Sequence, residues 1–475
     1  MGPDFHRPKA PKASGYTETA LPAETAAAGR DGPAQRFVAG ADIPAQWWSL
    51  FHSPDLDRLI RQALEMSPTL AAAQATLRQA EENMRAQAGA LLYPGVDAKL
   101  GAARQRSSGA ALGLANAVPN VFNLYNASVS VSYTINVSGS FMRALEGLQA
   151  QVDYQKYQTE AAYLALTANI VTTAIKEAAL RAQLKASREI LRTEEEQLAV
   201  VEKQFSLGGV SRPDVLAQRT QVAQTRASLP ALEKTLAQTR NLLSVYAGKL
   251  PGEAGLPEFD LASLSLPQEL PLSLPSALAR QRPDIRASEE LLHQASALVG
   301  VATGNLYPSL TLTGGYGQQA SQMSGLFSAP GTIWNVSGSL LQPLFRGGQL
   351  TAQRRAAVAA YDAALAQYRG TVLQAFQNVA DVLLALETGA RAHKAQTEAE
   401  ALARDTLDLT QKQFALGAVG YLALLNAQRQ YQQLRIDAIQ SAAARYADTA
   451  ALFQALGGGW WNRTALAQPA AANAN

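Results

Sequence analysis

The segment from Asn126 to Ser138, NASVSVSYTINVS, carries the strongest structural pattern in the sequence. Apolar and polar residues alternate along it, with Val129, Val131, Tyr133, Ile135 and Val137 at the apolar positions. In a β-strand this period of two places all the apolar side chains on one face. The opposite face carries Ser, Thr and Asn but no charge, which is unusual for a sheet open to bulk water. The two faces of this strand are therefore expected to contact different surroundings, and the solvent at each face has to be identified.

The composition excludes several functional classes. The chain has 475 residues, a formal net charge of +3 and 17% charged residues. A charge this small does not indicate a protein that binds nucleic acid. Cysteine is absent, so the chain has no disulfide, no thiolate metal site and no cysteine nucleophile. No apolar run reaches the length of about 18 residues that a transmembrane helix needs.

Two long windows lack Asp, Glu, Lys and Arg altogether, one between Arg106 and Arg143 and one between Glu290 and Arg346. Strands of about 10 residues, apolar on one face and polar on the other, are typical of membrane-spanning barrels. The alternative is a soluble hairpin with one solvated face. Four such strands lie in or beside the windows, at residues 94–104, 124–137, 308–318 and 332–342.

Four strands cannot close a barrel, and an open sheet edge in lipid would leave backbone groups without partners. The chain is therefore expected to oligomerise: two copies give eight strands and three give twelve. The uncharged polar face predicts water inside, which favours three copies over two. Aromatic residues near the strand ends are expected at the membrane interfaces: Tyr93, Tyr125, Tyr133, Tyr307, Tyr316 and Trp334.

The chain is internally duplicated. ALLYPGVDAKL at residues 90–100 matches GNLYPSLTLTG at 304–314, and EKQFSLGGV at 202–210 matches QKQFALGAV at 411–419. Each repeat is predicted to form a helix, two barrel strands and a long helical hairpin. The predicted domains are an extended N-terminal segment 1–54, a first repeat 55–246, an equatorial linker 247–275, a second repeat 276–456 and a C-terminal tail 457–475.

Helical periodicity fills most of each repeat. Runs of about 60 residues make rods of roughly 90 to 100 Å, and such long uninterrupted patterns suggest coiled-coil-like packing. A break is expected near Ser67-Pro68 in the first helix. The predicted helices are 55–90, 143–206 and 212–246 in the first repeat and 276–306, 349–415 and 421–456 in the second.

Signals for catalysis or metal binding are poor. The four His residues show no metal-ligand spacing, and no nucleophile elbow, P-loop or dinucleotide fingerprint is present. The run Glu194, Glu195 and Glu196 is interpreted as a solvated helix face. We therefore expect that the protein is not an enzyme and that it has no catalytic residue, no metal-binding residue and no cofactor.

Several motifs carry a family resemblance: MGPDFHRP at the start, WWSLFHSPDLDRLIRQAL at 47–64, ARQRPDIRASEELL at 279–292 and LLNAQRQY at 424–431. Together with the duplication, they make the chain resemble, over essentially its whole length, the outer membrane factor family. These TolC/OprM-like proteins are the outer-membrane channel subunits of tripartite efflux pumps. The chain looks nearest to their lipoprotein-type branch.

The resemblance implies a homotrimer in the bacterial outer membrane, with a twelve-stranded membrane β-barrel continued by a long α-helical barrel across the periplasm. It implies a periplasmic adaptor and an inner-membrane transporter, commonly proton-driven, as partners, and passive export of small molecules such as drugs. The outlet of a type I protein secretion system has the same fold and stays open as an alternative. So does a purely structural coiled-coil protein or adhesin. Branch members carry a lipid-acylated Cys just before a Val-Gly-Pro-Asp-Tyr-like start. Here Met1 stands where that Val would be and the Cys is absent, so the native protein is expected to carry an acylated Cys that this sequence lacks. A naturally unlipidated protein is the alternative.

The resemblance also assigns residues. The turns that join the long helices are expected to contact the adaptor, and their glycines to supply positive φ. These tips are Leu207, Gly208, Gly209, Val210, Leu416, Gly417, Ala418 and Val419. The periplasmic gate is expected beside them, at Asp214, Phe414, Asn426 and Arg429. Asn426 replaces the aspartate usual in the family motif, which puts an ion pair between Arg429 and residue 426 in doubt.

Overall fold

The computed structural model describes residues 2–11, 13, 15–29, 32–107, 120–253 and 255–463. Met1 and residues 464–475 of the predicted C-terminal tail lie outside these ranges. The chain divides into two compact units. The first comprises Met1–Pro8, Ala75–Lys156 and Ala287–Arg369, and the second comprises Lys9–Gln74, Tyr157–Arg286 and Gly370–Asn475.

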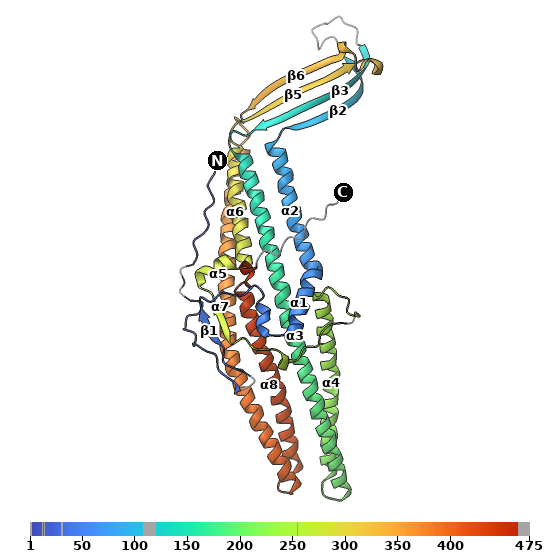
Figure 1. Ribbon diagram of the computed structural model, residues 1–475, viewed down its shortest axis with the longest axis vertical. Helices are drawn as coiled ribbons and strands as arrows, with labels where there is room; N and C mark the ends of the chain where they lie inside the picture. Colours follow the sequence, from blue (N-terminus) through green and yellow to red (C-terminus); the bar gives the residue numbers. More distant parts are fainter. Residues whose placement is uncertain are drawn as a thin grey trace. The chain divides into compact units, whose positions relative to one another are not determined.

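The first unit contains a four-stranded antiparallel sheet with strand order β2-β3-β5-β6 (Figure 1). All four strands predicted from the alternation form, each with ends within a few residues of the prediction. The outer strands β2 and β6 pair on one side only within the described residues. The bounds are β2 Gly95–Ser107, β3 Asn120–Ile135, β5 Ser309–Ala320 and β6 Thr332–Leu341.

The strand register gives this sheet two chemically different faces. Val129 pairs with Tyr316, which pairs with Trp334, so these side chains share one apolar face. This face is open in the single chain, since Trp334 is 74% exposed. On the other face hydroxyl groups bond across the strands, at 2.7 Å between Thr313 and Ser337. The sheet therefore buries neither face within one chain.

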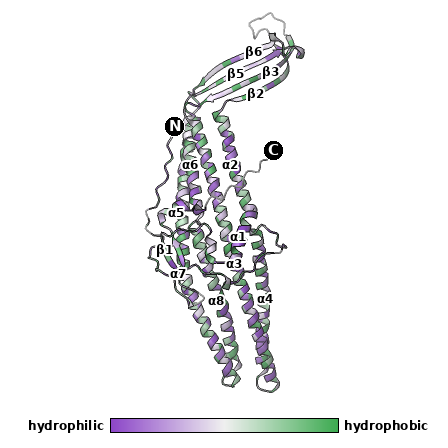
Figure 2. Ribbon diagram, in the orientation of Figure 1, coloured by the Kyte–Doolittle hydropathy of each residue, from purple (hydrophilic) through white to green (hydrophobic). Residues whose placement is uncertain are grey.

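Long helices make up most of the rest of the chain, and hydrophilic and hydrophobic residues are interspersed along them (Figure 2). Within the described part of the chain, none of the helices is long and apolar enough to cross a membrane. The α-helices are α1 Pro54–Met66, α2 Pro68–Leu92, α3 Ser140–Ser206, α4 Arg212–Tyr246, α5 Pro275–Gln281, α6 Pro283–Gly304, α7 Gln349–Ala415 and α8 Tyr421–Ala455. Short 3-10 helices cover Trp47–Phe51, Leu261–Ser263, Met323–Gly325, Ala329–Gly331 and Trp460–Asn462.

Prolines divide two of the predicted helices. The break at Ser67-Pro68 is confirmed, because Ser67 is extended with ψ 119°. The prediction of one unbroken helix over 276–306 is wrong, because Arg282 is extended with ψ 126° between α5 and α6. In both places the ring of the following proline disfavours the helical conformation of the residue before it.

The second unit has its own core, which is mostly aliphatic and contains a group of aromatic side chains around Trp47. Trp47 stacks on Phe453 with ring centroids 5.4 Å apart, and both side chains are fully buried. Beside this core β1 (Arg36–Ala39) and β4 (Glu269–Leu272) form a two-stranded parallel sheet. These two strands were not predicted, since the sequence of both segments indicated irregular or extended chain.

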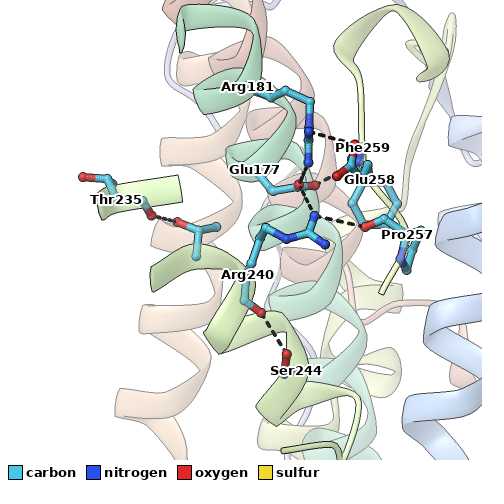
Figure 3. Close-up of polar contacts among 9 residues, drawn as sticks. Glu177, Arg181, Thr235, Arg240, Ser244, Pro257, Glu258 and Phe259 are labelled. Carbon is cyan, nitrogen blue, oxygen red and sulfur yellow. Dashed lines mark hydrogen bonds and ion pairs between the residues drawn. The ribbon is translucent and has the colours of Figure 1, made fainter. Parts of the chain in front are cut away.

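A buried carboxylate holds the segment after α4 against the helices (Figure 3). Glu177 of α3 accepts hydrogen bonds from Arg181 at 2.6 Å and from Arg240 of α4 at 2.8 Å. Its other oxygen accepts the backbone N–H of Phe259 at 2.9 Å. Arg181 also bonds Glu258 at 2.9 Å. The predicted linker is thus tied to α3 and α4 through one side chain.

Candidate functional site

The two turns that end the long helices have the same backbone geometry. Gly208 and Gly417 have φ of +80° and +73°, as the sequence predicted for a chain reversal. The next residue bonds back to the helix in each turn, from the N–H of Gly209 to Gln204 at 2.8 Å and from that of Ala418 to Gln413 at 2.9 Å. This is the Schellman pattern, in which a left-handed glycine satisfies the last carbonyls of a helix. The tips are therefore two copies of one structure.

The returning helices begin differently after the two turns. Ser211 caps α4, and its N–H donates to the Asp214 carboxylate at 2.9 Å. A carboxylate in the first turn is favoured because the helix dipole and the free N–H groups attract it. Gly420 occupies the corresponding cap of α8 and offers no side chain. Asp214, a predicted gate residue, thus bonds its own helix start and forms no hydrogen bond with Arg429.

The two tips line one open hollow of about 650 Å³. Leu207 and Leu416 occupy equivalent positions in the turns and are 78% and 85% exposed. Lining residues come from both turns and from the adjoining helix ends, among them Gln204, Gly209, Asp214, Phe414, Val419 and Tyr421. The structure therefore brings the two predicted tips together at one surface with exposed leucines.

An apolar cluster lies beneath the tips and joins the two hairpins. It contains Val201, Val215, Leu407, Tyr421, Leu424, Leu425 and Ala427, with Phe414 packed against it. The rings of Phe414 and Tyr421 meet edge to face, with centroids 5.8 Å apart. Phe414 is thus half-buried, and it packs the end of α7 against the start of α8.

A polar network lies further along the helices from the tips. Gln221 of α4 accepts from Nε of Arg429 at 2.6 Å, and its amide donates to Glu194 of α3 at 3.0 Å and to Gln432 of α8 at 3.2 Å. Beside it Gln218 donates to the Glu194 carbonyl at 2.8 Å and accepts from the Tyr421 hydroxyl. We call this set of six residues the polar layer. It links α3 and α4 to α8.

The interpretation of Glu194 as part of a solvated run is wrong. Its side chain is 2% exposed, and burial raises the pKa of its carboxyl, although bonds from Thr225 and Gln221 and the charge of Arg429 oppose that rise. Burial and the nearby Asp214 and Glu194 also raise the pKa of the Tyr421 hydroxyl. Glu195 does point outward, where it pairs with Arg226 at 2.6 Å.

The other two predicted gate residues differ in their contacts. Arg429 is exposed and reaches Gln221, a partner that the sequence analysis did not identify. Asn426 is exposed, and its side chain makes no hydrogen bond within the described residues. The helix pattern could have indicated the missed residues, because Gln218 and Gln221 lie in phase with the apolar Val215 and Val222 on the buried side of α4.

Arg429 also borders an open groove of about 610 Å³ between α3, α4 and α8. Its lining is rich in uncharged polar side chains, including Gln183, Gln224, Thr225, Gln432, Gln433 and Gln440. Amides and hydroxyls can bond water and many solutes without selecting a charge. Within the described ranges no group of His, Asp and Glu residues could hold a metal ion.

The predicted interface aromatics all lie on or next to the sheet. Tyr125, Tyr133, Tyr316 and Trp334 share its apolar face through the strand register. Tyr93 and Tyr307 follow α2 and α6, directly before β2 and β5, and are 68% and 43% exposed.

Comparisons with known proteins agree with this architecture. A family model described as "Outer membrane efflux protein" matches residues 59–249 and 274–458. The pyoverdine export outer membrane protein OpmQ of Pseudomonas aeruginosa is 33% identical over 423 residues, covering 87% of each chain. The probable efflux pump outer membrane protein TtgC of Pseudomonas putida is 28% identical over 471 residues, covering 98% of this chain and 93% of that protein. A solved structure of the outer-membrane channel OprN superposes with a TM-score of 0.86 at 25% identity, covering 97% of this chain and 99% of that chain.

Proposed function

The chain belongs to the outer membrane efflux protein family, and from this premise we propose that three copies form a passive export duct. The family is one of outer-membrane channel proteins and not of enzymes. The membership places the chain in the outer membrane as an efflux channel. The number of copies, the gate and the partners are our inference.

The four-stranded sheet supports the trimer. Its apolar face is exposed in one chain, and among the residues that the structure describes β2 and β6 each have one unpaired edge. Lipid would cover the apolar face, and pairing β6 of one copy with β2 of the next would satisfy both edges. Three copies then give a twelve-stranded barrel, wide enough for a water-filled interior lined by Ser, Thr and Asn.

We infer that an internal duplication supplies the strands and the helical hairpins that each chain adds to the duct. The long helices α3 and α7 both have 67 residues, and the returning helices α4 and α8 both have 35. The two turns share the same Schellman hydrogen bonds. We infer that each repeat, 55–246 and 276–456, supplies two strands and one hairpin, so that three chains present six similar tips.

The polar layer supports a constriction near these tips. Arg429 is tied to Gln221, which is tied in turn to buried Glu194. These bonds hold α8 against α3 and α4, and breaking them would free the helix ends to move apart. Asp214, Phe414, Asn426 and Arg429 are proposed to border the closed pore.

A periplasmic adaptor is the proposed partner at the tips, because Leu207 and Leu416 are exposed in the two turns and other residues of both turns line one hollow. An adaptor that binds the open state more tightly than the closed state would shift the population towards open. An inner-membrane transporter driven by protons would supply the cargo. One relative is a pyoverdine export protein and another belongs to a toluene efflux pump, so we propose small molecules as that cargo. The second candidate function is the outlet of a type I protein secretion system, and its only support is that such outlets have the same fold.

Conductance in planar bilayers tests the proposal. The purified protein should insert as a trimer and conduct weakly, and Arg429→Ala should raise the single-channel conductance. Asp214→Ala should raise it less, because Asp214 bonds its own helix start. Unchanged conductance in both variants would remove these residues from the gate. A protein that stays monomeric without detergent and does not insert would refute the duct itself.

A further inference from the structure

Two arginines project from the apolar face of the edge strand β2. Arg104 and Arg106 are both exposed, and the register of β2 with β3 is continuous from Gly95 to Ser107. Side chains alternate along a strand without a bulge, so both arginines lie on the same face as Val96 and Leu100. This inference rests on the proposed barrel, in which lipid covers the apolar face.

The arginines lie at a definite depth on that face. Strand rise and the tilt of barrel strands give roughly 2.5 Å of membrane depth per residue, so the path from Tyr93 to Arg104 covers about 27 Å. The apolar band of such barrels is about 25 Å tall. Tyr125 pairs with Ala102, one step before Arg104 on the same face. The arginines therefore follow directly after the aromatic residue at the strand end remote from α2.

No carboxylate of this chain can neutralise them there. Neither guanidinium group has an ion pair or hydrogen bond within the described residues. The sequence from 107 to 142 and from 291 to 345 contains no Asp or Glu, so the other three strands and their connecting loops carry none in any copy. Asp97 is the sole carboxylate in the four strands, and its odd position places it on the opposite face. The counter-ion must come from outside the protein.

We propose that Arg104 and Arg106 bind the phosphate groups of an anionic lipid in the outer leaflet. Guanidinium groups bind phosphate oxygens in pairs and lose little hydration in doing so. The two residues stand about 7 Å apart along the strand, close enough to share one phosphate group. The site would fix the depth of each subunit and seat a ring of lipids around the barrel.

Lipid binding to the purified full-length protein in neutral detergent tests this proposal. The probe is bisphosphorylated lipid A, with bound lipid counted by native mass spectrometry. Arg104→Gln with Arg106→Gln should weaken binding roughly 30-fold, because each basic residue at an anionic lipid surface contributes a factor of about five. Lys99→Gln, on the opposite face of the same strand, should bind as the wild type does.

Three results would overturn the proposal. These are wild-type affinity in the double variant, equal binding of lipid A stripped of its phosphates, and complete displacement by millimolar inorganic phosphate, which would indicate a free-anion site. Conductance measured on the same samples separates this inference from the channel. A wild type that conducts but binds no lipid A refutes the lipid site alone, whereas one that neither inserts nor conducts refutes the duct.

Discussion

The carboxylate of Glu177 accepts the backbone N–H of Phe259 at 2.9 Å, although 82 residues separate the two in the sequence. Glu177 is fully buried, and its partners Arg181 and Arg240 come from α3 and α4. A buried carboxylate costs free energy unless it is paired and hydrogen-bonded, and here each of its oxygens has a partner. This residue thus determines where the segment after α4 meets the helices.

Replacing Glu177 with Ala should lower the free energy of unfolding by about 2 to 4 kcal/mol, because two arginines and an amide lose their acceptor. The measurement is chemical denaturation in detergent followed by helical circular dichroism. Limited proteolysis should also cut faster within residues 247–275.

The matched control is Glu195→Ala on the same helix. Glu195 pairs with Arg226 at the surface, where removing an ion pair changes stability by about 1 kcal/mol or less. Equal stability of the two variants would contradict the role given to Glu177.

The polar layer predicts non-additive conductance. Gln221→Ala should raise single-channel conductance as Arg429→Ala does, because both changes break the 2.6 Å bond between these residues. The double variant should conduct no more than the larger single effect, since partners in one network do not add. Gln224→Ala serves as the control, because Gln224 lines the adjacent groove and its side chain has no hydrogen bond in the described residues. Additive increases would show that Gln221 and Arg429 act separately.

Local patterns explain why so much of the fold could be predicted. The helix Arg212–Tyr246 begins and ends at the predicted residues, because Pro213 and Asp214 mark its start and helical periodicity continues to its end. The four strands followed from a period of two inside windows free of charge. The parallel pair β1 and β4 could not be predicted, since each strand has four residues and the pairing joins segments more than 200 residues apart.

The site was predicted less completely, because its key contacts are tertiary. Glu194 looks solvated beside Glu195 and Glu196 in sequence. Its spacing from Ser187, Ile190 and Val201 nevertheless follows the helical repeat of buried positions, which could have indicated an inward side chain. The acceptor of Arg429, by contrast, lies 208 residues away and has no sequence signature.

The two tip glycines should respond equally to substitution. Gly208→Ala and Gly417→Ala should each cost about 1 kcal/mol, because the left-handed backbone strains a residue with a Cβ. An added Cβ would meet nothing within 4 Å at either position, so no steric clash contributes. The measurement is the free energy of unfolding in detergent.

Gly420→Ala is the control for this pair. Its φ is −76° and its surroundings are equally open, so stability should change by less than about 0.5 kcal/mol. A cost at Gly420 equal to that at Gly417 would show that tip substitutions act through something other than backbone strain.

Glu194 should make the stability of the protein depend on pH. Burial raises the pKa of its carboxyl in the folded state above the ordinary value of 4.5. A raised folded-state pKa means that its contribution is fully present below pH 4.5 and is lost as the pH rises through the folded value, where the buried group must ionise. Arg429 reduces this loss without cancelling it, and Tyr421 stays neutral throughout the range.

Glu194→Gln removes this titration and keeps an oxygen to accept from Gln221. The variant should therefore melt at the same temperature as the wild type near pH 4 and at a higher temperature at pH 8. Melting curves in detergent across this range provide the measurement, with Glu195→Gln as the exposed control expected to show no such divergence. A wild type that gains stability relative to Glu194→Gln as the pH rises would mean that Glu194 is stabilised as a carboxylate, held by Arg429 more strongly than burial penalises it.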